Sequence, residues 1–432
     1  MHHSNSLDSM QPRAHPEVMT TTSLPAAEAL APASAPSPRR SRAAHSAGFW
    51  TAVLSFAVAM AFSTIPTPLY ALYQQRDGFS SIVVTVIFAA YAVGVAVSLY
   101  LVGHVSDWWG RRFVFLAALA VEIVAAVMFL LWQDVTGLIV ARFVSGIGIG
   151  ELTATATAHI AELRAVAVPS STIAPVVSNF ANIGGLAVGP LAAGVLITWV
   201  PAPLETPYAV FLVLLVIALV ATAAIPETVD RGQRRRYRPQ RIAIPAAARG
   251  AFWAAGTGAF TGFAVFGLMM ALTPTVLAQA MGVTSRLAAG AVPFAVFMSA
   301  AVAQVLTVRL GLRRQLLLSW ILMGAGIALV AVAVALGALA AFVIGGIVAG
   351  AGVGVMFRAS LGVAGSLAPA GSRGEVLAAI FLIAYVGLAV PTLLIGAALA
   401  WLALPVVLGI FAGLVLVLIS VATPRMVRRL AA

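Results

Sequence analysis

Three ionisable side chains inside long apolar segments are the residues best placed to do chemistry. Glu122, Arg142 and Glu151 are each flanked by aliphatic runs long enough to cross a lipid bilayer. A charge at the centre of a bilayer costs about 3 kcal/mol or more, so such residues are functional by default. Carboxyl groups in that setting carry protons, and a guanidinium holds an anion. The sequence therefore indicates proton transfer or anion binding within a membrane.

Each of these residues also has a plainer interpretation. Arg142 lies near the outer end of its segment, from which a long side chain can reach the interface. Glu151 is our candidate proton carrier because desolvation favours the neutral carboxyl; the alternative is a structural group bonded to neighbouring Ser, Thr or backbone. For Glu122, a protonated carboxyl bonded between helices is favoured over a substrate ligand. Arg142 and Glu151 are nine positions apart (151 − 142), which places them on opposite faces of one helix.

The segments that carry these residues dominate the chain. Of the 432 residues, 62% are hydrophobic and 9% are charged, whereas a soluble domain has about 25% charged residues. Lipid cannot satisfy free backbone groups, so the fold class is an all-α integral membrane protein. Apolar runs of about 20 residues predict twelve transmembrane helices. The predicted spans are 49–72, 81–103, 112–132, 137–160, 172–198, 207–225, 250–275, 286–308, 315–336, 339–361, 374–397 and 398–422.

The distribution of positive charge predicts orientation. The net charge is +12, and most arginines lie in the N-terminal tail and in alternate loops, including 231–249. Such loops stay on the cytoplasmic side, so we expect both termini in the cytoplasm of a cell inner membrane. The cations then meet anionic headgroups rather than nucleic acid. The chain has no cysteine and no metal-binding histidine spacing, so neither a metal nor another cofactor is expected.

Two repeated motifs predict a duplicated six-helix unit. Gly146-Ile-Gly-Ile-Gly150 matches Gly350-Ala-Gly-Val-Gly354, and Gly185-Leu-Ala-Val matches Gly387-Leu-Ala-Val at nearly the same offset. We therefore expect two pseudo-symmetric bundles with a site at their interface. The expected parts are a disordered tail 1–47, a first bundle 48–225, a basic linker 226–249, a second bundle 250–424 and a C-terminal tail 425–432.

The loop between the second and third spans carries the most specific motif. It reads Gly103-His-Val-Ser-Asp107-Trp-Trp-Gly110-Arg-Arg, and G-x-x-x-D-x-x-G-R-R resembles the signature loop of the major facilitator superfamily. The resemblance implies that Asp107 faces the start of helix 11 and helps to hold a cytoplasmic gate shut. Trp108 stands where the family usually has Arg or Lys. Gly103 and Gly110 suit a tight turn.

The family relay further implies a partner for the two arginines of this loop. Arg111 or Arg112 is expected to pair with Glu162 at the end of helix 4. The alternative is that both arginines contact lipid headgroups.

Two helix motifs resemble those of the drug–proton antiporters in the same superfamily. Helix 4 has R-x-x-x-G-x-G beginning at Arg142, which is similar to a motif linked to proton transfer. Helix 5 has G-x-x-x-G-P-x-x-x-G. Its residues are Gly185, Gly189, Pro190 and Gly194. Proline kinks a helix and glycine permits close packing, so the resemblance implies a bend near the cavity.

Candidate cavity residues complete the prediction. Asn179 and Asn182 share a face of helix 5, where they line a cavity or join helices. Phe260, Phe263 and Tyr385 line the cavity, or else face lipid or the core. The prediction is a monomeric, proton-coupled transporter that exports small amphipathic or apolar compounds by alternating access. An uptake symporter for a sugar or organic acid is the alternative; an embedded enzyme or a sensor is remote, because no catalytic set is visible.

Overall fold

Helices make up the regular structure of the described residues in the computed structural model, which are 38–102, 106–229, 248–367 and 373–431. Within these ranges twelve helical spans are long and apolar enough to cross a membrane, which confirms the predicted number. The helices are α1 (Pro38–Phe62), α2 (Pro66–Asp77), α3 (Ser81–Val102), α4 (Ser106–Trp109), α5 (Arg111–Leu131), α6 (Val135–Ala167), α7 (Ala174–Trp199), α8 (Thr206–Ala223), α9 (Arg249–Ala271), α10 (Thr273–Met281), α11 (Arg286–Leu306), α12 (Leu312–Leu336), α13 (Leu339–Leu367), α14 (Arg373–Ala398) and α15 (Leu404–Ala431).

Some predicted boundaries differ from the helices. Helix α1 begins at Pro38, inside the predicted tail 1–47, and α15 continues past the predicted end at 424. Both extensions are basic, with Arg428 and Arg429 in the last turn of α15, where cations favour a helix C-terminus. Hydropathy alone ends a span too early at such positions, because the helix continues beyond the apolar core.

The first span is broken rather than continuous. Helix α1 ends at Phe62, and α2 restarts at Pro66, whose ring cannot continue a helix and whose missing N–H suits a first turn. The second half repeats the break between α9 and α10, where Pro274 again lies in the first turn. The two breaks occupy equivalent places in the two halves, as expected for a duplicated unit.

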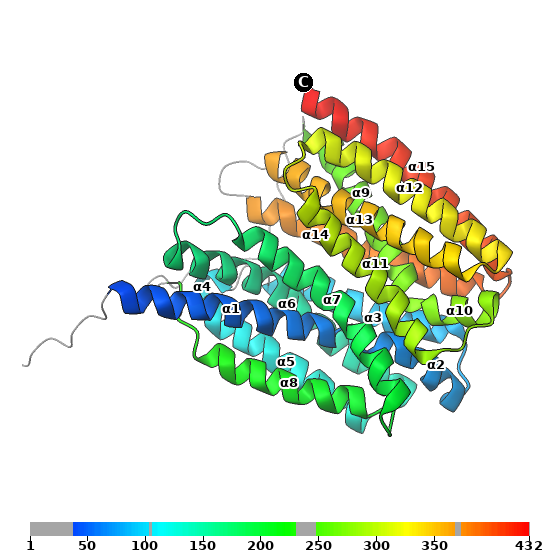
Figure 1. Cartoon of the computed structure of the whole chain (residues 1–432), viewed down its shortest axis with the longest axis horizontal. Helices are drawn as coiled ribbons and strands as arrows, with labels where there is room; N and C mark the ends of the chain where they lie inside the picture. The colour runs from blue at the N-terminus through cyan, green and yellow to red at the C-terminus, as the bar shows by residue number, and fades with distance from the viewer. Residues whose placement is uncertain (1–37, 103–105, 230–247, 368–372, 432) are drawn as a thin grey trace, which may run out of the picture.

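The helices form two bundles (Figure 1). Helices α1 to α8, coloured blue to green, pack with one another, and α9 to α15, coloured green to red, form the second bundle. Between them, α7 packs against α11 and α3 packs against α14. We call the end where α1, α5, α7, α9, α12 and α14 begin the basic end. The opposite end, which carries α2 and α10, is the far end.

Glycines bring the two bundles together in the half nearer the far end. A Cβ atom on Gly290 of α11 would lie 2.2 Å from the carbonyl oxygen of Pro190 in α7, and one on Gly396 of α14 would lie 2.2 Å from Thr85 of α3. Arg286 Nη1 also donates a hydrogen bond of 3.0 Å to the carbonyl oxygen of Ile197 across the same boundary. The far half of the bundle interface is therefore closed in this conformation.

The G-x-x-x-G-P-x-x-x-G motif of the fifth predicted span lies in α7 and contributes to this packing. A Cβ on Gly185 or Gly189 would meet the backbone of α1 at 2.7 Å and 2.1 Å, so these glycines let α7 lie directly against α1. Gly194 faces Gly290 of the other bundle. The motif thus places one helix against two partners, since small residues allow backbones to approach closely.

Candidate functional site

A narrow cavity of about 60 Å³ lies between the two bundles. The turn after α1 and helices α3, α6 and α7 line it from the first bundle, and α9, α11, α13 and α14 line it from the second. Eight rings form much of its wall: Phe88, Tyr91, Phe263, Phe266, Phe297, Phe357, Phe381 and Tyr385. In this conformation the cavity has room for a few waters but not for an organic molecule, for which several hundred Å³ are usual.

Arg142 projects from α6 into the wall of this cavity. Its side chain is 2% exposed, and its Nη1 donates a hydrogen bond to the carbonyl oxygen of Ser63. The guanidinium carbon lies 4.5 Å from the ring centre of Tyr91 and 5.6 Å from that of Phe88. The side chain is enclosed within the protein rather than extended along its surface, which argues against the snorkelling alternative.

The break after α1 explains this position. The last carbonyl groups of a helix have no partner within it and carry partial negative charge. Ser63 follows the last residue of α1, and its carbonyl oxygen accepts from Arg142. The guanidinium therefore caps α1 from a different helix, at a point that also borders the cavity.

Glu122 lies behind the cavity, between α5 and α6. It is 0% exposed, Ser145 Oγ donates a 2.9 Å hydrogen bond to its Oε2, and its Oε1 has no partner among the described residues. A Cβ on Gly148 would lie 2.4 Å from Oε1, so the glycine leaves room for the carboxyl group in this position. Glu122 and Arg142 also interact electrostatically. The predicted bonding between helices is confirmed, and Glu122 is not among the residues of the cavity wall.

Glu151, unlike Glu122, is only partly buried. It is half-buried on α6 and is not among the residues that line the cavity, whereas Arg142 is. No hydrogen bond to its carboxyl group is found in the described part of the chain. The predicted separation of Arg142 and Glu151 on α6 agrees with this arrangement.

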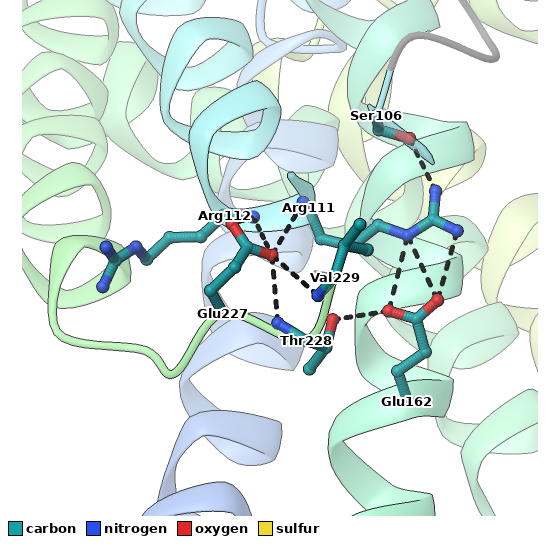
Figure 2. Close-up of polar contacts among 7 residues, drawn as sticks. All are labelled: Ser106, Arg111, Arg112, Glu162, Glu227, Thr228 and Val229. Atoms are coloured by element: carbon teal, nitrogen blue, oxygen red, sulfur yellow. Dashed lines mark hydrogen bonds and ion pairs between the residues drawn. The ribbon is translucent and has the colours of Figure 1, made fainter. Parts of the chain in front are cut away.

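Arg111 of the signature loop forms an ion pair with Glu162 (Figure 2). Its Nη2 lies 3.1 Å from Glu162 Oε1, and its Nη1 donates a 2.7 Å hydrogen bond to Ser106 Oγ. Gly110, at φ +97°, precedes α5 in a conformation that favours glycine. Arg111 is thus the partner of Glu162 that the resemblance implied. Gly103 and the side chain of Asp107 lie outside the described residues.

Glu227 and Thr228 belong to the same network and were not predicted. Glu227 Oε1 accepts from the backbone N–H of Arg111 at 2.9 Å, and Oε2 accepts from that of Arg112 at 3.2 Å. Thr228 Oγ1 donates to Glu162 Oε2. Pro-Glu-Thr was interpreted only as a helix stop. The available signal was an acidic side chain at the start of the linker 226–249, on the same side as the Gly-Arg-Arg motif, since carboxylates cap helix N-termini.

Replacing Glu227 with glutamine is expected to lower the stability of the folded chain by about 1 kcal/mol, because α5 loses a charged N-terminal cap. Thermal unfolding in detergent measures the change. Glu205→Gln is the matched control, since Glu205 precedes α8 but its side chain makes no capping hydrogen bond. Equal melting temperatures for the two variants would contradict the capping role.

The remaining candidate cavity residues lie in two different pockets, the central cavity and an apolar groove. Asn179, Asn182, Phe263 and Tyr385 line the cavity. Phe260 instead lines an apolar groove formed with α14 and α15 and is not among the residues of the central cavity. The rings of Tyr91 and Tyr385 approach to 6.5 Å between centres and connect the two bundles.

The described residues contain no cluster of three or more His, Asp or Glu side chains that could hold a metal ion. Two helical bundles around a central cavity, with the first helix of each broken, define a membrane transporter of the secondary type. Residues 51–391 match the family model described as Major Facilitator Superfamily, and the chain belongs to that family.

Individual relatives cover only part of the sequence. The chain is 32% identical over 124 residues to the arabinose-proton symporter of Bacillus subtilis (strain 168), which is 29% of this chain and 24% of that protein. It is 36% identical over 140 residues to the multidrug transporter MdfA of Yersinia pestis bv. Antiqua (strain Angola), which is 32% of this chain and 33% of that protein. The matches thus span about a third or less of each relative.

Solved structures share the whole fold. A crystal structure of a mutant of the nucleoside transporter NupG aligns with a TM-score of 0.66 at 11% identity, and covers 88% of this chain and 99% of that one. At this identity the match shows the fold alone. It confirms the predicted arrangement of helices.

Proposed function

We propose that this chain is a proton-coupled secondary transporter that exports small amphipathic or apolar compounds by alternating access. The observation that carries the proposal is the central cavity, whose wall combines rings from both bundles with a buried Arg142. A site at the interface of two repeats is reached from either side as the bundles rock. The aromatic wall suits compounds with an apolar body.

The basic end is proposed to face the cytoplasm. Arg111, Arg112, Arg309 and Arg428 lie in loops or helix ends on that side, as the positive-inside rule requires. The closed far half then faces away from the cytoplasm, and Asp107 is proposed to secure the opposite gate when the cycle reverses. Residues 48–225 and 250–424 are proposed as the two moving units.

Glu122 is the proposed proton site. It is fully buried, has a carboxyl oxygen without a partner among the described residues, and interacts electrostatically with a residue of the cavity wall. Glu151 has no such connection to the cavity in this conformation. Glu122 is therefore the better-placed carrier, in contrast to the order expected from sequence alone.

An uptake symporter for a small metabolite is the second candidate. Arg142 favours it, because it is the one cation among the described residues of the cavity wall and can hold an acidic metabolite. The arabinose-proton symporter and the multidrug transporter among the relatives represent the two candidates, one each.

Transport in inside-out vesicles tests the proposal. Aromatic probes of neutral, cationic and anionic type are offered to vesicles with an imposed proton gradient. We expect accumulation of at least one probe that collapses when a protonophore is added. The control is vesicles from cells without the protein. No difference from that control, or accumulation indifferent to the protonophore, would rule out a proton-coupled exporter of such compounds.

A further inference from the structure

The cavity wall is chemically divided between the two bundles. The first bundle contributes all of the nitrogen-bearing side chains, namely Arg142, Asn179 and Asn182, together with the rings of Phe88 and Tyr91. The second contributes a set of rings, in which Phe266 and Phe297 stack at 4.0 Å and Phe263 lies 4.9 Å from Phe357. A molecule that spans the cavity therefore meets a polar, positively charged side and an apolar side.

The positive charge on the polar side has no acidic partner in the wall, since Glu122, which interacts with Arg142 electrostatically, lies behind the wall. The described residues that line the cavity include no Asp or Glu, and Arg142 forms no ion pair within 4 Å. Its Nη1 donates to the Ser63 carbonyl oxygen, while its Nε is buried without a partner. Ring faces and one carbonyl group stabilise a cation less than a carboxylate does, since hydrogen bonds between charged groups are the strong ones.

A ligand can supply the acidic group that the cavity wall lacks. The guanidinium fork matches the geometry of a carboxylate, sulfonate or phosphate group. An anion there would satisfy buried donors and neutralise a desolvated charge, whereas a cationic ligand would be repelled and would find no acid to receive it. The amides of Asn179 and Asn182 offer further neutral donors from α7.

We propose that the cavity takes an amphipathic organic anion, with its acidic group on Arg142 and its aromatic or aliphatic body among the rings of the second bundle. The inference rests on the proposed transport function, because it names the class of compound that the same cavity carries. Such a ligand contacts both bundles at once, so it stabilises the conformations in which they are close.

Three naphthalene compounds of one shape and different charge provide the test. 1-Naphthoate, 1-naphthalenemethanol and 1-naphthylmethylammonium are titrated into the purified full chain in detergent at one pH and low salt, and the dissociation constants are measured by calorimetry. Naphthoate is expected to bind at least about tenfold more tightly than the alcohol. The ammonium compound is expected to bind most weakly.

Substitutions of two matched arginines test whether Arg142 causes the preference for naphthoate over the alcohol. Arg142→Met is expected to lower the affinity for naphthoate to that for the alcohol measured on the same variant, and Arg142→Lys to keep part of the preference. Arg286→Met is the control, because Arg286 also donates to a backbone carbonyl between helices but lies outside the cavity wall. It should keep the ratio between the naphthoate and alcohol affinities, because Arg286 acts on closure of the far half and not on the charge in the cavity.

Two results would overturn the inference. One is equal affinity of the unsubstituted chain for naphthoate and the alcohol. This result does not depend on whether any variant folds. The other is a naphthoate preference that survives in Arg142→Met, since the anion would then be held elsewhere. Both leave protonophore-sensitive vesicle transport untouched, so they are distinguishable from a failure of the proposed function.

Discussion

Gly290→Val is expected to reduce transport about a hundredfold without unfolding the chain. A Cβ at this position would lie 2.2 Å from the Pro190 carbonyl oxygen and 3.1 Å from Gly194 Cα, and these backbone atoms cannot move aside as a flexible side chain can. The far half then fails to close, and the conformational equilibrium shifts toward the state open at that end. About 5.5 kcal/mol is enough to invert a 99:1 ratio of two states.

Cysteine labelling measures that shift directly. The chain has no natural cysteine, so Leu186→Cys, at the cavity wall, reports access without background. Labelling by a membrane-impermeant maleimide from outside intact cells should increase in Gly290→Val. Gly413→Val is the matched control, because a Cβ there would meet nothing within 4 Å. Transport at the unsubstituted rate by Gly290→Val would show that far-side closure does not need this contact.

Glu122→Gln is expected to abolish gradient-driven accumulation while substrate exchange continues. Glutamine has nearly the same shape, and its amide oxygen can still accept from Ser145, so packing between α5 and α6 is preserved. It cannot gain or lose a proton. Substrate-induced proton movement, recorded with a pH dye on the detergent-solubilised chain, should disappear.

Glu151→Gln is the control for this experiment. Its side chain is half-buried and not in the cavity wall, so the variant is expected to retain coupling. If proton movement were instead lost in Glu151→Gln and undiminished in Glu122→Gln, the proton site would be Glu151, as sequence alone suggested.

The sequence predicted those features that depend on local pattern. Apolar runs specified all twelve spans, since each must satisfy its own backbone within lipid. The pairing of Arg111 with Glu162 followed from a resemblance between motifs. The break between Phe62 and Pro66 was missed, because the flanking residues are apolar and a hydropathy window averages across it.

Features that depend on packing between distant helices were not predictable in the same way. Phe260 and Phe263 are one turn apart, yet Phe263 lines the cavity and Phe260 lines an outer groove. Which of them borders the cavity depends on the angle at which α9 meets α14, which no local pattern encodes. Glu227 was missed for a related reason, since its partners lie more than a hundred positions earlier in the chain.

The network around Arg111 connects α4, α5, α6 and the loop after α8, all within one bundle. Contacts of this kind are expected to travel with the bundle as a unit and to be the same before and after it rocks. An interaction of equal strength in two conformations cancels from the equilibrium between them. Substitutions within this network, by selection or by design, are therefore expected to change thermal stability without changing the side to which the cavity opens.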